Sequence, residues 1–258
     1  MKRILVGNHK MNLLTLAERD NYLSSLLLEA KKISRSALEI VVCPACVHLE
    51  KFAKELSTAG MGAGVQNIYA ESRGSFTGEI SAPMVSSLGA THVIVGHSER
   101  RNLFGETNAQ SNAKIRAAIS AGLNVIYCVG ESAKERKEGS LSAVIESQLA
   151  EGLEGVAVSQ LDKVIVAYEP IWAVGSDQIP STDEIMEARI LLRKILSRIY
   201  GLEKVNGVRI LYGGSVKAAT AKQLCVEAGM DGVLVGRESL IPGEFLKIGE
   251  IINKAYDI

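Results

Sequence analysis

The sequence is poor in the residues that mark several classes of protein. Its 258 residues include one tryptophan and only 5% aromatic residues, which argues against a surface that stacks nucleic-acid bases. Lys+Arg and Asp+Glu both number 29, so the net charge is zero and nothing predicts binding to nucleic acid or to an anionic membrane. No apolar run is long enough for a signal peptide or a membrane span. We therefore expect a soluble, cytoplasmic protein.

Metal-binding patterns are also missing. The four cysteines include one C-x-x-C pair, Cys43 and Cys46, and an isolated pair is weak evidence for a zinc or redox site because a zinc ribbon needs a second pair. No two of the four histidines have the spacing of metal ligands, and no carboxylate cluster suggests a divalent ion. The sequence predicts neither a metal nor a cofactor.

What the chain does contain is a series of eight short apolar runs rich in Val, Ile, Leu and Ala. They lie at 3–7, 39–44, 62–66, 91–96, 124–130, 163–170, 208–214 and 231–236. Because they lack polar alternation, they resemble strands of a parallel sheet that is covered on both faces. The run at 62–66 is the weakest prediction, since its glycines are equally typical of a loop.

Helical patterns fill the gaps between these runs, at 15–32, 108–122, 142–155 and 181–201. Ser181 stands three residues before Glu184, which predicts a capping box at the start of the last of them. Eight strand–helix units in about 250 residues predict a single (β/α)₈ barrel domain over residues 1–258. A doubly wound open sheet is the alternative, but it more often has a glycine-rich fingerprint after its first strand, where this chain reads GNHKMN.

In such a barrel, catalytic residues follow the carboxyl ends of the strands. Asn8 and Lys10 follow the first run, His97 follows the fourth and Glu169 ends the sixth. A carboxylate, an imidazole and an ammonium without a metal suit the removal of a proton next to a carbonyl group. The glycine-bearing loops after the seventh and eighth runs stand where phosphate sites recur in this fold.

Five segments at these strand ends, GNHKMN, VGHSERR, CVGE, AYEPIWAVG and YGGSV, closely resemble the signature segments of the triosephosphate isomerase family. They occur in the family's order across essentially the whole chain. The resemblance implies a cofactor-free enzyme of glycolysis and gluconeogenesis. Such an enzyme interconverts dihydroxyacetone phosphate and glyceraldehyde 3-phosphate through an enediolate. The pairing of a glutamate base with a neutral histidine is the established chemistry of that family and is not deduced from this chain.

The resemblance also implies a role for each matched residue. Glu169 is expected to move the proton, His97 to polarise the carbonyl, and Lys10 to attract the phosphorylated substrate and stabilise charge on the enediolate. Asn8 is expected to bind the substrate or orient Lys10, with Glu99 and Ser98 supporting these groups. The phosphate is expected to bind Gly175, Gly214, Ser215, Gly236 and Arg237. The expected lid over the site consists of Pro170, Ile171, Trp172, Ala173, Val174, Gly175 and Ser176.

The segment GSFTGEIS resembles the loop that the family inserts into a neighbouring subunit. The resemblance therefore implies a homodimer in which Thr77 reaches the Asn8 and Lys10 region of the partner.

The sequence departs from the family pattern at three places. His9 replaces the usual tryptophan, Ser176-Asp177-Gln178-Ile179-Pro180 replaces a Thr-Gly-Lys-like hinge, and Arg237 replaces the second of two glycines. The last two changes resemble those in relatives that act on four-carbon sugar phosphates in polyol catabolism, so an erythrulose phosphate is an alternative substrate. A phosphate-binding barrel with little catalysis is a further alternative, although a pure binder has no need of a base.

Overall fold

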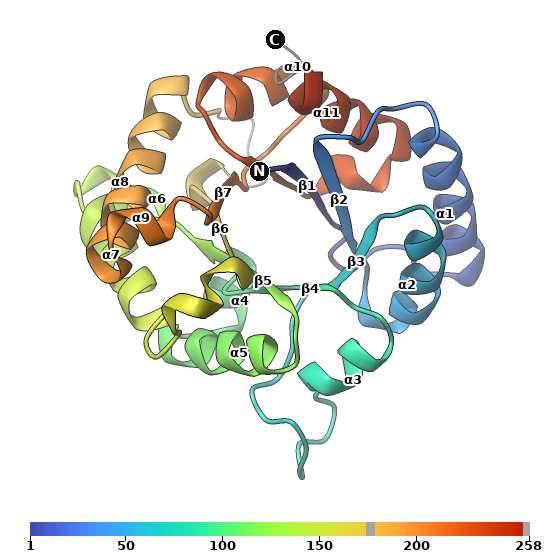
Figure 1. Ribbon diagram of the computed structural model, residues 1–258, viewed down its shortest axis with the longest axis horizontal. Helices are drawn as coiled ribbons and strands as arrows, with labels where there is room; N and C mark the ends of the chain where they lie inside the picture. The colour runs from blue at the N-terminus through green and yellow to red at the C-terminus, as the bar shows by residue number, and fades with distance from the viewer. Residues whose placement is uncertain (174–178, 255–258) are drawn as a thin grey trace.

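The computed structural model of the protein describes residues 1–173 and 179–254. Eight parallel strands form a closed barrel in sequence order, in which β8 pairs with β1 (Figure 1). The strands are β1 (Arg3–Asn8), β2 (Leu38–Cys43), β3 (Gly62–Val65), β4 (His92–Val95), β5 (Asn124–Val129), β6 (Val164–Tyr168), β7 (Arg209–Tyr212) and β8 (Gly232–Val235). Every predicted strand is confirmed, the run at 62–66 included, and the closure excludes the open sheet.

Helices surround the barrel as an outer ring (Figure 1). They are α1 (Leu16–Ala30), α2 (Leu49–Thr58), α3 (Ala82–Ser87), α4 (Ser98–Phe104), α5 (Asn108–Ser120), α6 (Ala133–Lys137), α7 (Leu141–Gly152), α8 (Thr182–Tyr200), α9 (Leu202–Val205), α10 (Ala218–Ala221) and α11 (Pro242–Lys254). The four predicted helices are confirmed as α1, α5, α7 and α8. The capping box of α8 is confirmed too, since the Ser181 side chain accepts from the Glu184 N–H and the Glu184 carboxylate accepts from the Ser181 N–H. Over the described ranges, no helix is long and apolar enough to cross a membrane.

Successive side chains of each strand point to opposite faces of the sheet, which divides the core into two layers. On β1, Ile4 and Val6 belong to the cluster that fills the barrel, whereas Leu5 packs into the layer between the strands and the helices. Both layers are apolar, which explains why the eight runs show no polar alternation. The filled interior leaves the carboxyl ends of the strands as the rim on which a site can form.

Short helical turns follow two strands at that rim, namely η3 (Ile171–Ala173) after β6 and η5 (Arg237–Leu240) after β8. The segment between β3 and α3, which contains Thr77, extends beyond the ring of helices (Figure 1). Thr77 is exposed there and is not among the residues that line the cavity described below.

Candidate active site

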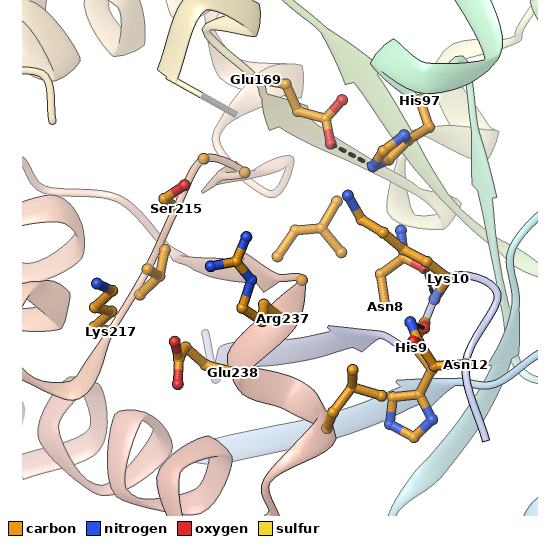
Figure 2. Close-up of a pocket in the computed structure, with 16 residues that line it drawn as sticks. Asn8, His9, Lys10, Asn12, His97, Glu169, Ser215, Lys217, Arg237 and Glu238 are labelled. Atoms are coloured by element: carbon orange, nitrogen blue, oxygen red, sulfur yellow. Dashed lines mark hydrogen bonds and ion pairs between the residues drawn. The ribbon is translucent and has the colours of Figure 1, made fainter. Parts of the chain in front are cut away.

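A cavity of about 310 Å³ opens at the carboxyl ends of the strands. Figure 2 shows Glu169 and His97 facing each other in it, with Lys10 beside them and Arg237 directed into it from η5. The structure thus brings together most of the residues expected at the site. Those that line the cavity are Asn8, Lys10, His97, Glu169, Gly214, Ser215, Gly236 and Arg237.

Glu169 follows β6 and is almost completely buried, with 2% of its surface exposed. Its Oε2 accepts a hydrogen bond of 3.0 Å from the Ser98 N–H, while its Oε1 has no hydrogen-bond partner among the described residues. A Cβ on Gly130 would lie 1.8 Å from the Glu169 carbonyl oxygen, and one on Gly213 would lie 2.7 Å from Glu169 Cγ. Glycine is therefore required on both neighbouring strand ends for the carboxylate to take this place.

His97 is the N-cap residue of α4 and is 6% exposed. Its Nδ1 accepts from the Glu99 backbone N–H at 3.2 Å, so the proton of the neutral ring is on Nε2. Nε2 lies 3.3 Å from Glu169 Oε1. The start of α4 therefore fixes both groups, since one of its N–H groups holds the imidazole and the preceding one holds the carboxylate.

Lys10 is held in place by several neighbouring groups. Its backbone has a φ of 53°, which is uncommon for a residue other than glycine. Its N–H donates to Asn8 Oδ1 at 3.0 Å, and its carbonyl accepts from Gln66 Nε2 at 2.9 Å. Its ammonium forms an ion pair with Glu99 Oε1 at 2.5 Å. Glu99 thus contacts His97 through its backbone and Lys10 through its side chain, a placement consistent with the supporting role expected for it.

The loops after β7 and β8 form the opposite side of the cavity. The Ser215 hydroxyl donates to the Ala173 carbonyl at 3.1 Å, and a Cβ on Gly236 would lie 3.9 Å from Lys10 Nζ. The Arg237 side chain is exposed, and no hydrogen bond or ion pair joins it to another residue in the described ranges. This side therefore offers a close backbone approach and an unpaired cation, which together suit an anion.

The expected lid is only partly visible. Pro170 follows Glu169, and Ile171, Trp172 and Ala173 form η3. Val174, Gly175 and Ser176 lie outside the described residues, as do Asp177 and Gln178 of the unusual hinge. The predicted phosphate contact of Gly175 remains a prediction.

Glu131 is a residue whose role the sequence did not reveal. It lies in the matched CVGE segment and is fully buried. Its carboxylate accepts hydrogen bonds from Tyr168 Oη at 3.1 Å and from Trp172 Nε1 at 2.9 Å. Arg136 lies 3.3 Å from the same carboxylate, with its guanidinium 5.1 Å from the centre of the Trp172 ring. These contacts fix η3 and the end of β6, from which Glu169 extends.

Two features bear on other chemistry. Cys128 is buried below Glu169, and burial followed by the nearby carboxylate raises the pKa of its thiol, so it stays protonated. All four cysteines are free. Within the described part of the chain, no three His, Cys, Asp or Glu residues are grouped so that they can hold a metal ion.

Comparisons with known proteins agree with this geometry. The family model described as triosephosphate isomerase matches residues 3–252. The triosephosphate isomerase of Prosthecochloris aestuarii is 40% identical over 254 residues, which are 98% of this chain and 99% of that protein. The one from Carboxydothermus hydrogenoformans is 39% identical over 247 residues, which are 96% of this chain and 97% of that protein.

The solved structures give the same result. The crystal structure of triosephosphate isomerase from Bartonella henselae superposes with a TM-score of 0.87 at 32% sequence identity, and the match covers 97% of this chain and 99% of that one.

Proposed function

Because the chain belongs to the triosephosphate isomerase family, we propose that it interconverts dihydroxyacetone phosphate and glyceraldehyde 3-phosphate. The observation that carries the proposal is the 3.3 Å approach of Glu169 Oε1 to His97 Nε2 in a cavity that Lys10 also lines. The reaction moves hydrogen within one molecule, so it is an internal oxidation and reduction. It needs no metal, because Glu169, His97 and Lys10 supply the base and the charge stabilisation.

Each of these three groups has one task in the reaction. Glu169 Oε1, which accepts no hydrogen bond from the described residues, removes a proton from one carbon and returns it to the neighbouring carbon. His97 donates a hydrogen bond from Nε2 to the oxygen on which negative charge develops, and the substrate's hydroxyl proton moves to that oxygen by way of this imidazole, so that the carbonyl and the hydroxyl exchange places. The Lys10 ammonium stabilises that charge, and Asn8 orients Lys10 by accepting its N–H. The two reacting carbons of the substrate are adjacent. The same three side chains can therefore act on the carbonyl group of either substrate without moving.

The phosphate of the substrate is proposed to bind at the opposite side of the cavity. Backbone N–H groups around Gly214, Ser215 and Gly236 are free to approach an anion closely because glycine has no side chain. Arg237 adds a guanidinium whose fork of donors matches two phosphate oxygens. The substrate is thereby held with its carbonyl end toward Glu169 and His97.

We also propose that the protein is a homodimer, in which Thr77 approaches the Lys10 region of the partner subunit. In support, the segment between β3 and α3 projects from the barrel, and large apolar side chains such as Met11 and Val47 are 88% and 85% exposed in the single chain. Sedimentation equilibrium tests this, and a species of 27.7 kDa at micromolar concentration would contradict it. A cytoplasmic location and a role in glycolysis and gluconeogenesis belong to the same proposal. The free thiols support the location.

The two alternatives are not favoured by the comparisons, in which the relatives and the solved structure bear the name triosephosphate isomerase. The deciding experiment compares turnover of glyceraldehyde 3-phosphate with turnover of erythrulose phosphates, and follows deuterium uptake from solvent into the product. We expect rapid triose turnover with label at the carbon that receives the proton. Negligible triose turnover beside rapid tetrulose turnover would overturn the substrate, and no turnover of either would leave a phosphate-binding barrel.

A further inference from the structure

His9 lies between Asn8 and Lys10 in the sequence but has no part in the reaction described above. Its imidazole is fully buried. The ring packs edge to face against Tyr22 of α1, with centroids 4.5 Å apart, and against Phe52 of α2, with centroids 5.6 Å apart. Tyr22 and Phe52 are stacked on each other at 5.9 Å. His9 is thus one member of a three-ring cluster directly behind the loop that presents Lys10.

The imidazole contributes to this cluster through ring packing and not through hydrogen bonds. Neither of its nitrogens makes a hydrogen bond of normal geometry with the described residues, although the Ser239 backbone is close enough to raise the pKa of the ring by less than burial lowers it. Burial lowers its pKa to about 4, so the ring is neutral near pH 7. The titratable groups around it are Tyr22, on α1, and His48, whose charge would lower its pKa further. His9 therefore contributes the shape of its ring to the packing of the cluster.

The backbone of His9 links the position of its ring to the position of Lys10. The His9 N–H donates to the Cys43 carbonyl at 3.1 Å, and the His9 carbonyl accepts from Asn12 Nδ2 at 2.7 Å. Lys10 follows at once with its left-handed backbone, a conformation that persists only where the surroundings hold it. A change in the packing of the His9 ring therefore acts first on Lys10.

The same cluster also contacts the loop after β8. Tyr22 Oη donates to the Ser239 carbonyl at 2.8 Å. The Ser239 hydroxyl donates to the Gly236 carbonyl at 2.6 Å and lies 3.3 Å from the Asn8 carbonyl. Two loops from opposite ends of the chain, one carrying Lys10 and the other Gly236 and Arg237, are therefore supported by one packed group of rings.

We propose that His9 is a positioning residue that sets the spacing between Lys10 and the Gly236–Arg237 loop, and so controls how tightly this site holds a phosphate group. The inference rests on the proposed function only in taking the anion to be the phosphate of the substrate. Glu169 and His97 are fixed separately by α4, so His9 can affect proton transfer in the bound complex only through the charge stabilisation that Lys10 supplies.

The test replaces His9 by alanine and by phenylalanine and measures KM and kcat. His9→Ala removes the ring, and we expect KM to rise about tenfold while kcat falls by less than about threefold, because Lys10 shifts but Glu169 and His97 keep their places. His9→Phe restores a flat ring and is expected to return KM to within about twofold of the wild-type value. A role in fold stability alone predicts less active protein but an unchanged KM, which would overturn the proposal.

Two further variants keep the test decisive. Leu192→Ala opens a cavity under α8, away from these loops, and is expected to lower the melting temperature without raising KM. Tyr22→Phe keeps the ring and removes only its hydrogen bond to Ser239, so it tests the link should His9→Ala fail to fold. We expect it to raise KM about threefold, less than His9→Ala, since only one hydrogen bond is lost. An unchanged KM in both Tyr22→Phe and His9→Ala would reject the positioning role.

Calorimetric titration with inorganic phosphate separates this inference from the proposed function. If the wild-type protein binds phosphate but turns over no triose phosphate, and His9→Ala binds phosphate about tenfold more weakly, the positioning role holds and the isomerase proposal fails. If turnover is normal and neither KM nor the phosphate affinity changes in His9→Ala, the isomerase proposal holds and the positioning role fails.

Discussion

On one side of the cavity Glu169 and His97 are nearly buried, and backbone N–H groups at the start of α4 hold both of them. On the other side the Arg237 side chain is exposed and makes no hydrogen bond or ion pair with the described residues. The proton-transfer side is therefore arranged before any substrate arrives, whereas the guanidinium on the phosphate side must become ordered when the anion binds.

This difference follows from what each side has to do. Proton transfer needs donor and acceptor atoms within hydrogen-bond reach, and preorganised groups require no rearrangement during the reaction. Phosphate binding tolerates more freedom, because a charge acts over a longer range than a hydrogen bond. Changes on the first side should therefore alter kcat, and changes on the second side should alter KM.

The largest expected effect comes from Glu169→Gln. The amide keeps the size of the side chain and can still accept from the Ser98 N–H, but it cannot take a proton from carbon. We expect kcat to fall by about 10³-fold, within the range for the loss of a general base, while KM changes only a few-fold. Steady-state assays in both directions measure the effect, and a kcat within tenfold of wild type would show that the buried side does not carry the reaction.

A change of pH tests the burial of His9, which lies behind the loop that carries Lys10. Its pKa is about 4 when folded and about 6.5 when unfolded, so the unfolded state binds more protons between these values. The contribution of His9 to the free energy of unfolding should be constant above pH 6.5 and fall by about 3 kcal/mol as the pH drops to 4. Urea unfolding at fixed protein concentration measures it.

His9→Phe is the matched control for this prediction, since it keeps a ring and removes the titrating group. His92 must be separated from it, because burial lowers the pKa of His92 to about 4 as well. His92 remains in the His9→Phe variant, so the difference between the two pH curves isolates His9. Identical pH curves for the wild type and His9→Phe would show that the titration of His9 does not change the free energy of unfolding.

Much of the barrel and the reaction centre was predictable because local patterns determine it. A strand that is buried on both faces has a continuous apolar sequence, so eight such runs gave the eight strands. The parallel arrangement then required Lys10, His97 and Glu169 to share one rim, and the structure places all three in one cavity.

What the sequence could not predict depends on contacts between distant segments. Glu131 was visible at the end of a strand, but its bonds to Tyr168 and Trp172 join residues whose approach only the fold determines. The replacement of tryptophan by His9 was equally visible, yet nothing in the sequence places its ring against Tyr22 and Phe52. Residue types mark chemistry, whereas burial and hydrogen-bond partners are properties of the folded chain.

The smallest expected effect tests the phosphate side through Arg237→Gln. Because the guanidinium is unpaired in the free protein, removing it leaves no buried partner without a bond, and only the attraction to the anion is lost. We expect KM to rise about tenfold with kcat nearly unchanged, the pattern of lost ground-state binding, and the rise to shrink at high salt.

Arg237→Lys keeps the charge without the fork of donors and should recover part of the loss. Lys32→Gln removes one positive charge after the end of α1, away from the cavity, and controls for net charge. If Arg237→Gln instead lowers kcat as Glu169→Gln does, Arg237 acts on the transition state, and the division of the cavity into a side that reacts and a side that binds is wrong. If it changes neither constant, the glycine-bearing backbone alone holds the phosphate.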